Sequence, residues 1–225
     1  MTGGWRARWL PHWWPGASAP PRADGVERWL VLDLEASGLD PRNAEILAIA
    51  ALGVRVDWSN RRLWLVLSDS FSIDLRRETR QVDAANILVH GIGVGQQSAG
   101  VEPAVALRSF CEFAAGAPLL AFHAEYDRRL MARHLPLHGL PQLPQDWLDI
   151  AALCTVAHPK ARERSLDEWL VRMGIECLAR HEAMADVLAE CELLQMVWPH
   201  AAAECGSWPA LRRYAGRHRW LAASA

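Results

Sequence analysis

The sequence predicts an α/β fold in which helices flank a mixed sheet. Three strand-like segments come first and are joined by short turns, which indicates an antiparallel meander. Helical patterns follow, arranged around one more short apolar strand, and this order is typical of a mixed sheet covered by helices. The chain has 225 residues, of which 51% are hydrophobic. That is enough for one medium-sized domain with a buried core and some excess at its ends.

The strands are expected at four places. Residues 29–35 form an apolar run that ends in two acids, and a turn signal follows over residues 37–41. Two more apolar runs, over residues 46–56 and 62–71, complete the meander. A short buried strand is expected over residues 118–122, because this run is brief and apolar.

Helices are expected wherever the apolar residues recur with helical spacing. The first two cover residues 102–115 and 125–134. A third opens with a capping-box pattern at residue 165 and should stop near Gly174. A longer helix is predicted from about residue 182 to residue 198, ending before Pro199.

The folded domain is predicted to span residues 28–198, with a flanking segment on each side. Residues 1–27 are rich in tryptophan and proline, and they form either a loose tail or a docking segment for a protein partner or a membrane face. Residues 199–225 are predicted to be a helical tail whose arginines lie on a solvated face.

Composition and charge exclude several classes of protein. The formal net charge of −2 argues against a protein that coats duplex DNA. The same charge is compatible with an enzyme that binds only a few nucleotides. The five cysteines are scattered and form no C-x-x-C pair, which indicates reduced thiols rather than a zinc site or disulfides. No apolar run approaches the roughly 20 residues of a membrane span. Prolines interrupt the first 21 residues, so a non-secretory, cytoplasmic protein is expected.

Two acids at the end of the first strand are the first candidate for chemistry. Asp33 and Glu35 are two residues apart, so both carboxylates point to the same face of a strand. Neighbouring carboxylates repel each other unless a cation lies between them, and such hard oxygen ligands suit Mg²⁺ or Mn²⁺. Surface acids are also common at strand ends, so this pattern alone leaves both interpretations open.

A second candidate follows the short strand at residues 118–122. Asp127 comes at the start of the next helix, where an acid either complements the helix dipole or faces Asp33 across the strand ends. Tyr126 is either a core aromatic residue or a group that places a substrate or water. The residues themselves do not separate these alternatives.

The third candidate pairs His181 with Asp186. A spacing of five residues separates two side chains by about 140° around a helix, so they cannot share one helical face. If the two residues act together, His181 must lie on the loop that enters the helix, and Asp186 on the first turns of that helix.

Together the three candidates resemble the histidine-containing branch of the DEDD 3′→5′ exonuclease superfamily, which includes the proofreading epsilon subunit of bacterial DNA polymerase III. The D-x-E motif is matched by residues 33–38, the aromatic-Asp motif by residues 123–127, and H-x-A-x-x-D by residues 181–186. Residues 90–92 also match a family H-G-I segment. The resemblance covers roughly residues 28–198, and the ordered set is more specific than any single motif.

The resemblance implies a ribonuclease H-like mixed sheet, built of an antiparallel meander plus parallel strands, and a two-metal hydrolase. It implies four metal ligands, which are Asp33, Glu35, Asp127 and Asp186, and two divalent cations, Mg²⁺ or Mn²⁺. His181 would deprotonate the attacking water, because the unperturbed pKa of imidazole is about 6.5. Residues implied in substrate binding are Ser37, Gly38, Leu39, His90, His123 and Tyr126.

Two positions depart from the family pattern, and neither removes a metal ligand. His123 stands where asparagine is usual, and Ala36 stands where a hydroxyl residue is common, although Ser37 supplies one next door. These departures bear on substrate positioning. Leu39 and His90 either stack on or wedge the terminal bases, or are plain turn and core residues.

The expected activity is release of nucleoside 5′-monophosphates from the 3′ end of single-stranded DNA, in proofreading or repair. Trimming of RNA 3′ ends is the alternative substrate assignment, because discrimination rests on contacts to the 2′ position. A non-catalytic subunit of the same fold, which binds nucleic acid or a partner, is the alternative from another class. A polymerase or other protein partner would dock on the tryptophan-rich residues 1–27.

Overall fold

A five-stranded mixed sheet forms the centre of the molecule. The computed structural model describes residues 25–77, 99–143 and 146–219. The strand order is β3-β2-β1-β4-β5; the β1–β2 and β2–β3 pairs are antiparallel, whereas β1–β4 and β4–β5 are parallel. The strands are β1 (Val26–Ala36), β2 (Ile46–Asp57), β3 (Arg62–Asp74), β4 (Leu119–Ala121) and β5 (Trp147–Asp149). The predicted meander with added parallel strands is therefore confirmed.

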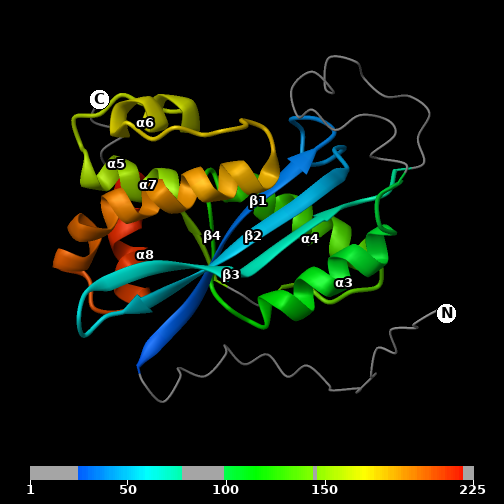
Figure 1. The fold of residues 1–225 in the computed structure, drawn as a ribbon, viewed down its shortest axis with the longest axis horizontal. Helices are drawn as coiled ribbons and strands as arrows, with labels where there is room; N and C mark the ends of the chain where they lie inside the picture. The colour runs from blue at the N-terminus through cyan, green and yellow to red at the C-terminus, as the bar shows by residue number, and fades with distance from the viewer. Residues whose placement is uncertain (1–24, 78–98, 144–145, 220–225) are drawn as a thin grey trace.

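Helices cover both faces of the sheet (Figure 1). One face carries α3 (Pro103–Ala114) and α4 (Glu125–Leu137). The opposite face carries α5 (Ile150–Ala157), α6 (Leu166–Met173), α7 (Ala183–Glu204) and α8 (Trp208–Gly216). In the part of the chain described, no helix is both long enough and apolar enough to cross a membrane.

Strand β1 separates two hydrophobic cores, because its residues point alternately to the two faces of the sheet. Trp29 and Val31 belong to the core beneath α5–α8, whereas Leu30, Leu32 and Leu34 belong to the core beneath α3 and α4. All five side chains are buried. A central strand with both faces covered must be apolar along most of its length, so the two acids near its end are exceptional.

Helix α6 follows the predicted capping chemistry in detail. Ser165 accepts a hydrogen bond from the backbone N–H of Glu168, and the Glu168 side chain accepts one from the backbone of Ser165. Gly174 ends the helix with a φ of 68°, in the left-handed region that favours glycine. These caps fix where the chain leaves α6 and turns back toward α7.

The predicted end of the long helix before Pro199 is wrong. Helix α7 continues through Pro199 to Glu204, and α8 follows it. Tertiary packing offsets the backbone hydrogen bond that proline removes, because Trp198 is buried and its indole N–H donates to the carbonyl of Arg61 at 2.9 Å. The C-terminal segment is also more than a solvated helical face, since α8 buries Trp208 in the core.

The topology brings the end of β1, the residues after β4 and the beginning of α7 to one end of the sheet. Because β1 and β4 are parallel, their carboxyl ends lie at the same edge, and residues that follow them are neighbours in space. The beginning of α7 reaches the same region, across the face that it covers (Figure 1). The three motifs of the sequence occur at these three places.

Candidate active site

Three carboxylates from two elements converge at the end of β1. Asp33 and Glu35 lie on β1, and Asp186 lies in the first turn of α7. Each offers a carboxylate oxygen, and these atoms all lie within 4.8 Å of one another. Oxygens this close can share one small hard cation, so the geometry fits Mg²⁺ or Mn²⁺.

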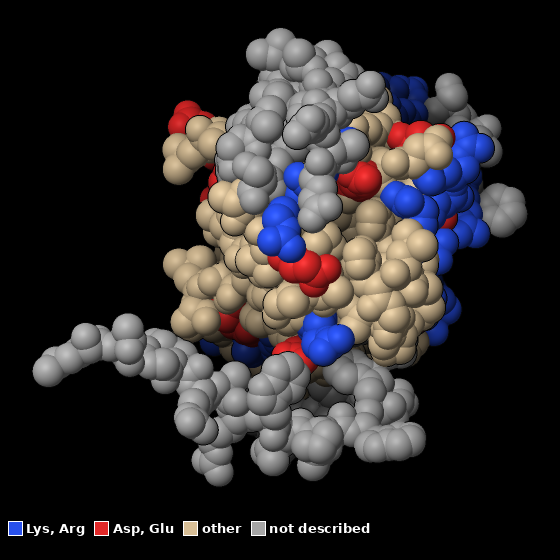
Figure 2. Space-filling model, turned by 90° about the vertical axis from the view of Figure 1, so that its right-hand side faces the viewer, with Lys and Arg blue, Asp and Glu red and all other residues tan. Residues whose placement is uncertain are grey.

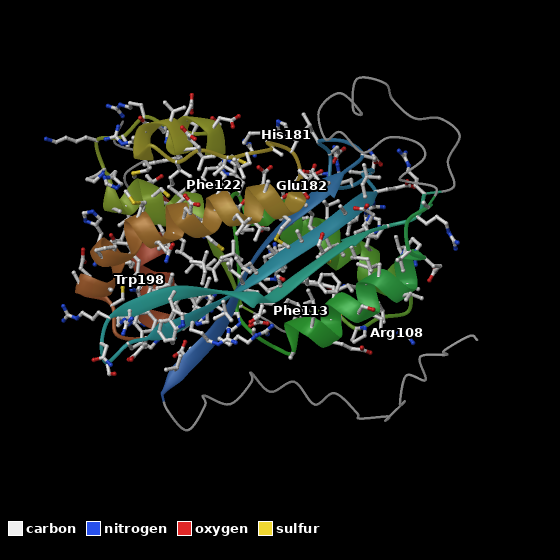
Figure 3. All side chains as sticks on the ribbon, viewed as in Figure 1. Arg108, Phe113, Phe122, His181, Glu182 and Trp198 are labelled. Atoms are coloured by element: carbon white, nitrogen blue, oxygen red, sulfur yellow. The ribbon has the colours of Figure 1, made fainter. Side chains whose placement is uncertain are left out.

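His181 lies on the loop before α7, the position expected if it acts together with Asp186. It precedes the helix with a φ of 64°, and Glu182 caps the helix by accepting a hydrogen bond from Ala185 N. Figure 3 labels His181 and Glu182 at this end of α7. The backbone N–H of His181 donates to Asp186 Oδ2 at 3.0 Å, so the loop geometry and the carboxylate position are coupled.

Asp127 lines the cavity that contains Asp33 as well as lying in the first turn of its own helix. Its side chain is only 4% exposed, although it lies on the first turn of α4. Within the described residues, α4 begins after Ala124 with no side-chain capping hydrogen bond. Asp127 lines the same cavity as Asp33, which favours the second of the two interpretations that the sequence left open.

The acids surround a cavity of about 590 Å³. Its walls come from the end of β1, the segment after β4, the beginning of α6 and the beginning of α7. The lining includes Asp33, Glu35, Gly38, Leu39, His123, Tyr126, Asp127, Asp167, Arg180, His181, Asp186 and Glu190. This volume is typical of sites that hold a small molecule or the end of a longer polymer.

On the face shown in Figure 2, basic side chains gather toward one edge, beside acidic residues. Most of the remaining described surface in that view carries neither kind of charge. A continuous basic surface of the kind that wraps duplex DNA is therefore not seen on the described part of this face, in agreement with the net charge of −2.

Three carboxylates at the site, those of Asp33, Glu35 and Asp127, have raised pKa values because they are desolvated and lie close to other acids. Desolvation raises the pKa of Asp33 to about 7, and the charge of Asp186 adds to the rise. Desolvation, followed by the charges of Asp33 and Asp186, raises the pKa of Glu35 to about 9. Burial, followed by the charge of Asp33, raises the pKa of Asp127 well above its usual range. This mutual repulsion is what a bound cation relieves.

These shifts predict that the metal-free protein loses stability as pH rises. The pKa values are 3.8 and 4.5 in the unfolded chain but about 7 and 9 for folded Asp33 and Glu35. Between these limits the folded state binds more protons, so its stability falls with increasing pH. Urea unfolding with chelator should give a lower midpoint at about pH 8.5 than at about pH 5. The difference should shrink in Glu35→Gln; an unchanged difference would contradict the assignment.

Tyr126 and Ser37 shape the turn after β1. The Tyr126 hydroxyl donates to the carbonyl of Gly38 and so ties α4 to this turn. Burial raises the pKa of Tyr126 to about 12, which keeps its phenol protonated as a donor. The Ser37 hydroxyl accepts from Glu45 N at 2.9 Å and closes the loop, and Ser37 does not line the cavity. These contacts place Gly38 and Leu39 at the cavity wall.

His123 occupies a position with unusual backbone geometry. Its φ is 60°, a conformation in which asparagine and histidine are both enriched. Its backbone N–H donates to Asp149 Oδ1 at 3.0 Å, and its Nε2 lies 3.0 Å from the carbonyl of Arg164. The replacement of the family's usual asparagine by histidine is therefore compatible with the turn after β4.

Of the two residues predicted to contact terminal bases, Leu39 belongs to the described part of the chain and His90 does not. Leu39 is 96% exposed and lines the cavity, so it is not a core residue. An exposed apolar side chain beside the acids is suited to stacking on a base. His90 lies outside the described residues, as do residues 91–92 of the H-G-I segment.

Two residues of the site went unrecognised in the sequence. Glu190 is 1% exposed, lines the cavity and accepts a hydrogen bond from Phe122 N at 3.1 Å. Burial, followed by the charge of Asp33, raises its pKa. Its position four residues after Asp186, on the same helical face, was the signal that a helical projection offered. Arg180 also lines the cavity and forms ion pairs with Asp167 and Asp186.

A protein-family model and a curated relative both match most of this chain. A family model described as Exonuclease (RNase_T) matches residues 30–194. A DNA polymerase III subunit epsilon-like protein of Rhodobacter capsulatus is 32% identical over 174 residues, which are 76% of this chain and 24% of that protein. The chain therefore spans about a quarter of the length of that relative.

Two solved structures share the fold at low sequence identity. E. coli exonuclease I in complex with a dA16 oligonucleotide is 17% identical with a TM-score of 0.66, over 88% of this chain and 45% of that one. The zinc-bound form of an E. coli exonuclease I complex with single-stranded DNA is 18% identical with a TM-score of 0.65, over 87% of this chain and 45% of that one.

Proposed function

The chain belongs to the exonuclease family and has a ribonuclease H-like fold, and on this basis we propose that it is a metal-dependent 3′→5′ exonuclease. The substrate is the 3′ end of single-stranded DNA, and the product is a nucleoside 5′-monophosphate. The observation that carries the proposal is the convergence of Asp33, Glu35 and Asp186 oxygens within 4.8 Å, beside a cavity that His181 also lines.

The donor set fits a pair of divalent cations. Asp33, Glu35 and Asp186 would hold them together with Asp127, which is buried against the same cavity. All four side chains supply carboxylate oxygens, the ligands that Mg²⁺ and Mn²⁺ prefer. Bound there, the cations would neutralise the phosphate, ease deprotonation of water and stabilise the charge on the leaving oxygen.

The residues of this chain perform the remaining steps. His181 accepts a proton from a water molecule as that water attacks the phosphorus atom of the terminal phosphodiester. The bond from phosphorus to the 3′ oxygen breaks, and this oxygen takes up a proton from a water molecule, so the shortened strand keeps a 3′ hydroxyl. The terminal nucleotide leaves with the phosphate on its 5′ oxygen. Leu39 stacks on the terminal base, and the Gly38 turn held by Tyr126 sets the position of Leu39.

Single-stranded DNA is favoured over RNA as the substrate. The oligonucleotide complexes of E. coli exonuclease I, which shares the fold, support this choice. The formal net charge of −2 also favours a short stretch of single strand over a duplex. RNA remains the second candidate, because the choice depends on contacts to the 2′ hydroxyl.

The test is a degradation assay on end-labelled oligonucleotides of DNA and RNA with Mg²⁺, with Mn²⁺ and with chelator. A 5′ label should yield a ladder of shortening products, and a 3′ label should appear at once as a mononucleotide, in metal only. An Asp127→Asn variant, purified in parallel, controls for contaminating nucleases. Metal-independent cleavage, or release of the 5′ label first, would refute the proposal, and the faster substrate decides between DNA and RNA.

The proposal assigns catalysis to residues 28–198, and the family match over residues 30–194 supports this division. Residues 199–225 then form a C-terminal segment, part of which packs on the catalytic domain through α8. A polymerase or other partner would dock on residues 1–27, of which 1–24 lie outside the described chain. The epsilon-like name of the Rhodobacter relative supports a role in proofreading or repair.

A further inference from the structure

Three donors of the protein itself contact the carboxylate of Asp186. Its Oδ1 accepts from the guanidinium of Arg180 and lies 3.5 Å from the thiol of Cys177. Its Oδ2 accepts from the backbone N–H of His181 at 3.0 Å. Arg180 is the charged donor among these three, so a cation that binds Asp186 is repelled by Arg180 and competes with it for this carboxylate.

Arg180 bridges the beginnings of two helices. Its Nε pairs with Asp167 on α6, and its Nη1 pairs with Asp186 on α7. The side chain of Asp186 is 6% exposed, whereas that of Asp167 is 61% exposed. Release of the Asp186 pair would therefore leave the guanidinium with a second, well-solvated carboxylate partner.

The charge of Arg180 acts on the metal-ligand candidates in the same direction as a bound cation. It lines the cavity that contains Asp33, Glu35 and Asp186. Its guanidinium pairs directly with Asp186, and carboxylate oxygens of Asp33, Glu35 and Asp186 lie within 4.8 Å of one another. In the metal-free protein, Arg180 thus supplies part of the positive charge that the acids require.

We propose that Arg180 is a positioning residue that stabilises the metal-free site by pairing with Asp186 and that competes with divalent cations for this carboxylate. The inference rests on the proposed function, because it requires the acids to bind metal. Arg180 stabilises the metal-free cluster, and it withdraws to Asp167 when a cation takes Asp186. Thermodynamic linkage requires that the Arg180–Asp186 pair weaken cation binding by the same factor by which the bound cation weakens the pair.

Two consequences separate this role from a purely structural one. In Arg180→Met the competing charge is gone, so Mn²⁺ should bind about tenfold more tightly, the scale of one partly buried charged hydrogen bond. The same variant should melt at a lower temperature in chelator and gain more from added Mn²⁺ than the wild type does. Arg180→Lys keeps the charge and should stay close to the wild type in Mn²⁺ affinity.

The experiment measures the dissociation constant for Mn²⁺ by isothermal titration calorimetry, with melting curves in chelator and in Mn²⁺. Arg28→Met is the matched control, because the Arg28 side chain is 24% exposed against 26% for Arg180. Arg28 lies at the start of β1, away from the acid cluster, and pairs with Asp69 of β3. This control should melt lower with unchanged Mn²⁺ affinity. Arg180→Gln, which keeps neutral donors, provides a second test in case the methionine variant does not fold.

Equal or weaker Mn²⁺ binding by both Arg180→Met and Arg180→Gln would overturn the inference, since Arg180 would then only shape the loop. In that case the proposed function stands if the wild type binds Mn²⁺. Failure of the wild type to bind Mn²⁺ would overturn both together. Tighter binding in the neutral variants, with near-normal binding in Arg180→Lys, supports the inference.

Discussion

Replacing Asp33 with asparagine should lower the rate of nucleotide release at least about 1000-fold, because the site loses a charged metal ligand and the electrostatic stabilisation that depends on it. Asp33 is the acid most central to the site, since its charge raises the pKa of Glu35, Asp127 and Glu190. The measurement is single-turnover release of a 3′-terminal label in Mg²⁺, with calorimetric titration of Mn²⁺ on the same preparation.

The Asp33→Asn protein should remain folded. The substitution preserves the size of the side chain and removes one of several repelling charges, so the melting temperature in chelator should equal or exceed that of the wild type. A matched control is Asp57→Asn, because Asp57 lies at the far end of β2, where it accepts from Ser59 and Asn60. This control should keep full activity. Normal turnover in Asp33→Asn would remove the acid cluster from the mechanism.

Replacing His181 with alanine should slow hydrolysis at least about 100-fold and leave metal binding intact, because the general base is lost but the carboxylates remain. Single-turnover rates and Mn²⁺ dissociation constants, compared with the wild type, measure the two effects separately. Saturating substrate should not restore the rate, since the defect lies in the chemical step.

The His181→Asn variant tests the loss of the general base more specifically than His181→Ala does. The residue has a φ of 64°, a conformation that asparagine tolerates better than alanine does. Asparagine should therefore preserve the loop and the hydrogen bond from the backbone N–H to Asp186, yet it cannot accept the proton. His200→Ala, on the exposed surface near the far end of α7, should keep wild-type activity. Near-normal turnover in His181→Asn would show that another group deprotonates the water.

Local patterns determined the parts of the site whose geometry depends on a few neighbouring residues. The two-residue spacing of Asp33 and Glu35 puts both on one face of any strand. Helical geometry also predicts the loop position of His181, on the condition that His181 acts together with Asp186. The capping box of α6 likewise depends on residues three apart. These local features do not depend on how the rest of the chain packs.

Only the tertiary structure decided which groups share the cavity. Helix α7 passes through Pro199 because burial of Trp198 outweighs a lost backbone hydrogen bond, and the sequence carries no measure of that balance. Glu190 and Arg180 belong to the site because α7 packs across the sheet beside the ends of β1 and β4. The charge on each of these residues is plain in the sequence, but its distance from the other charges depends on the fold. Electrostatic interactions act through space, so their partners are known only once the chain is folded.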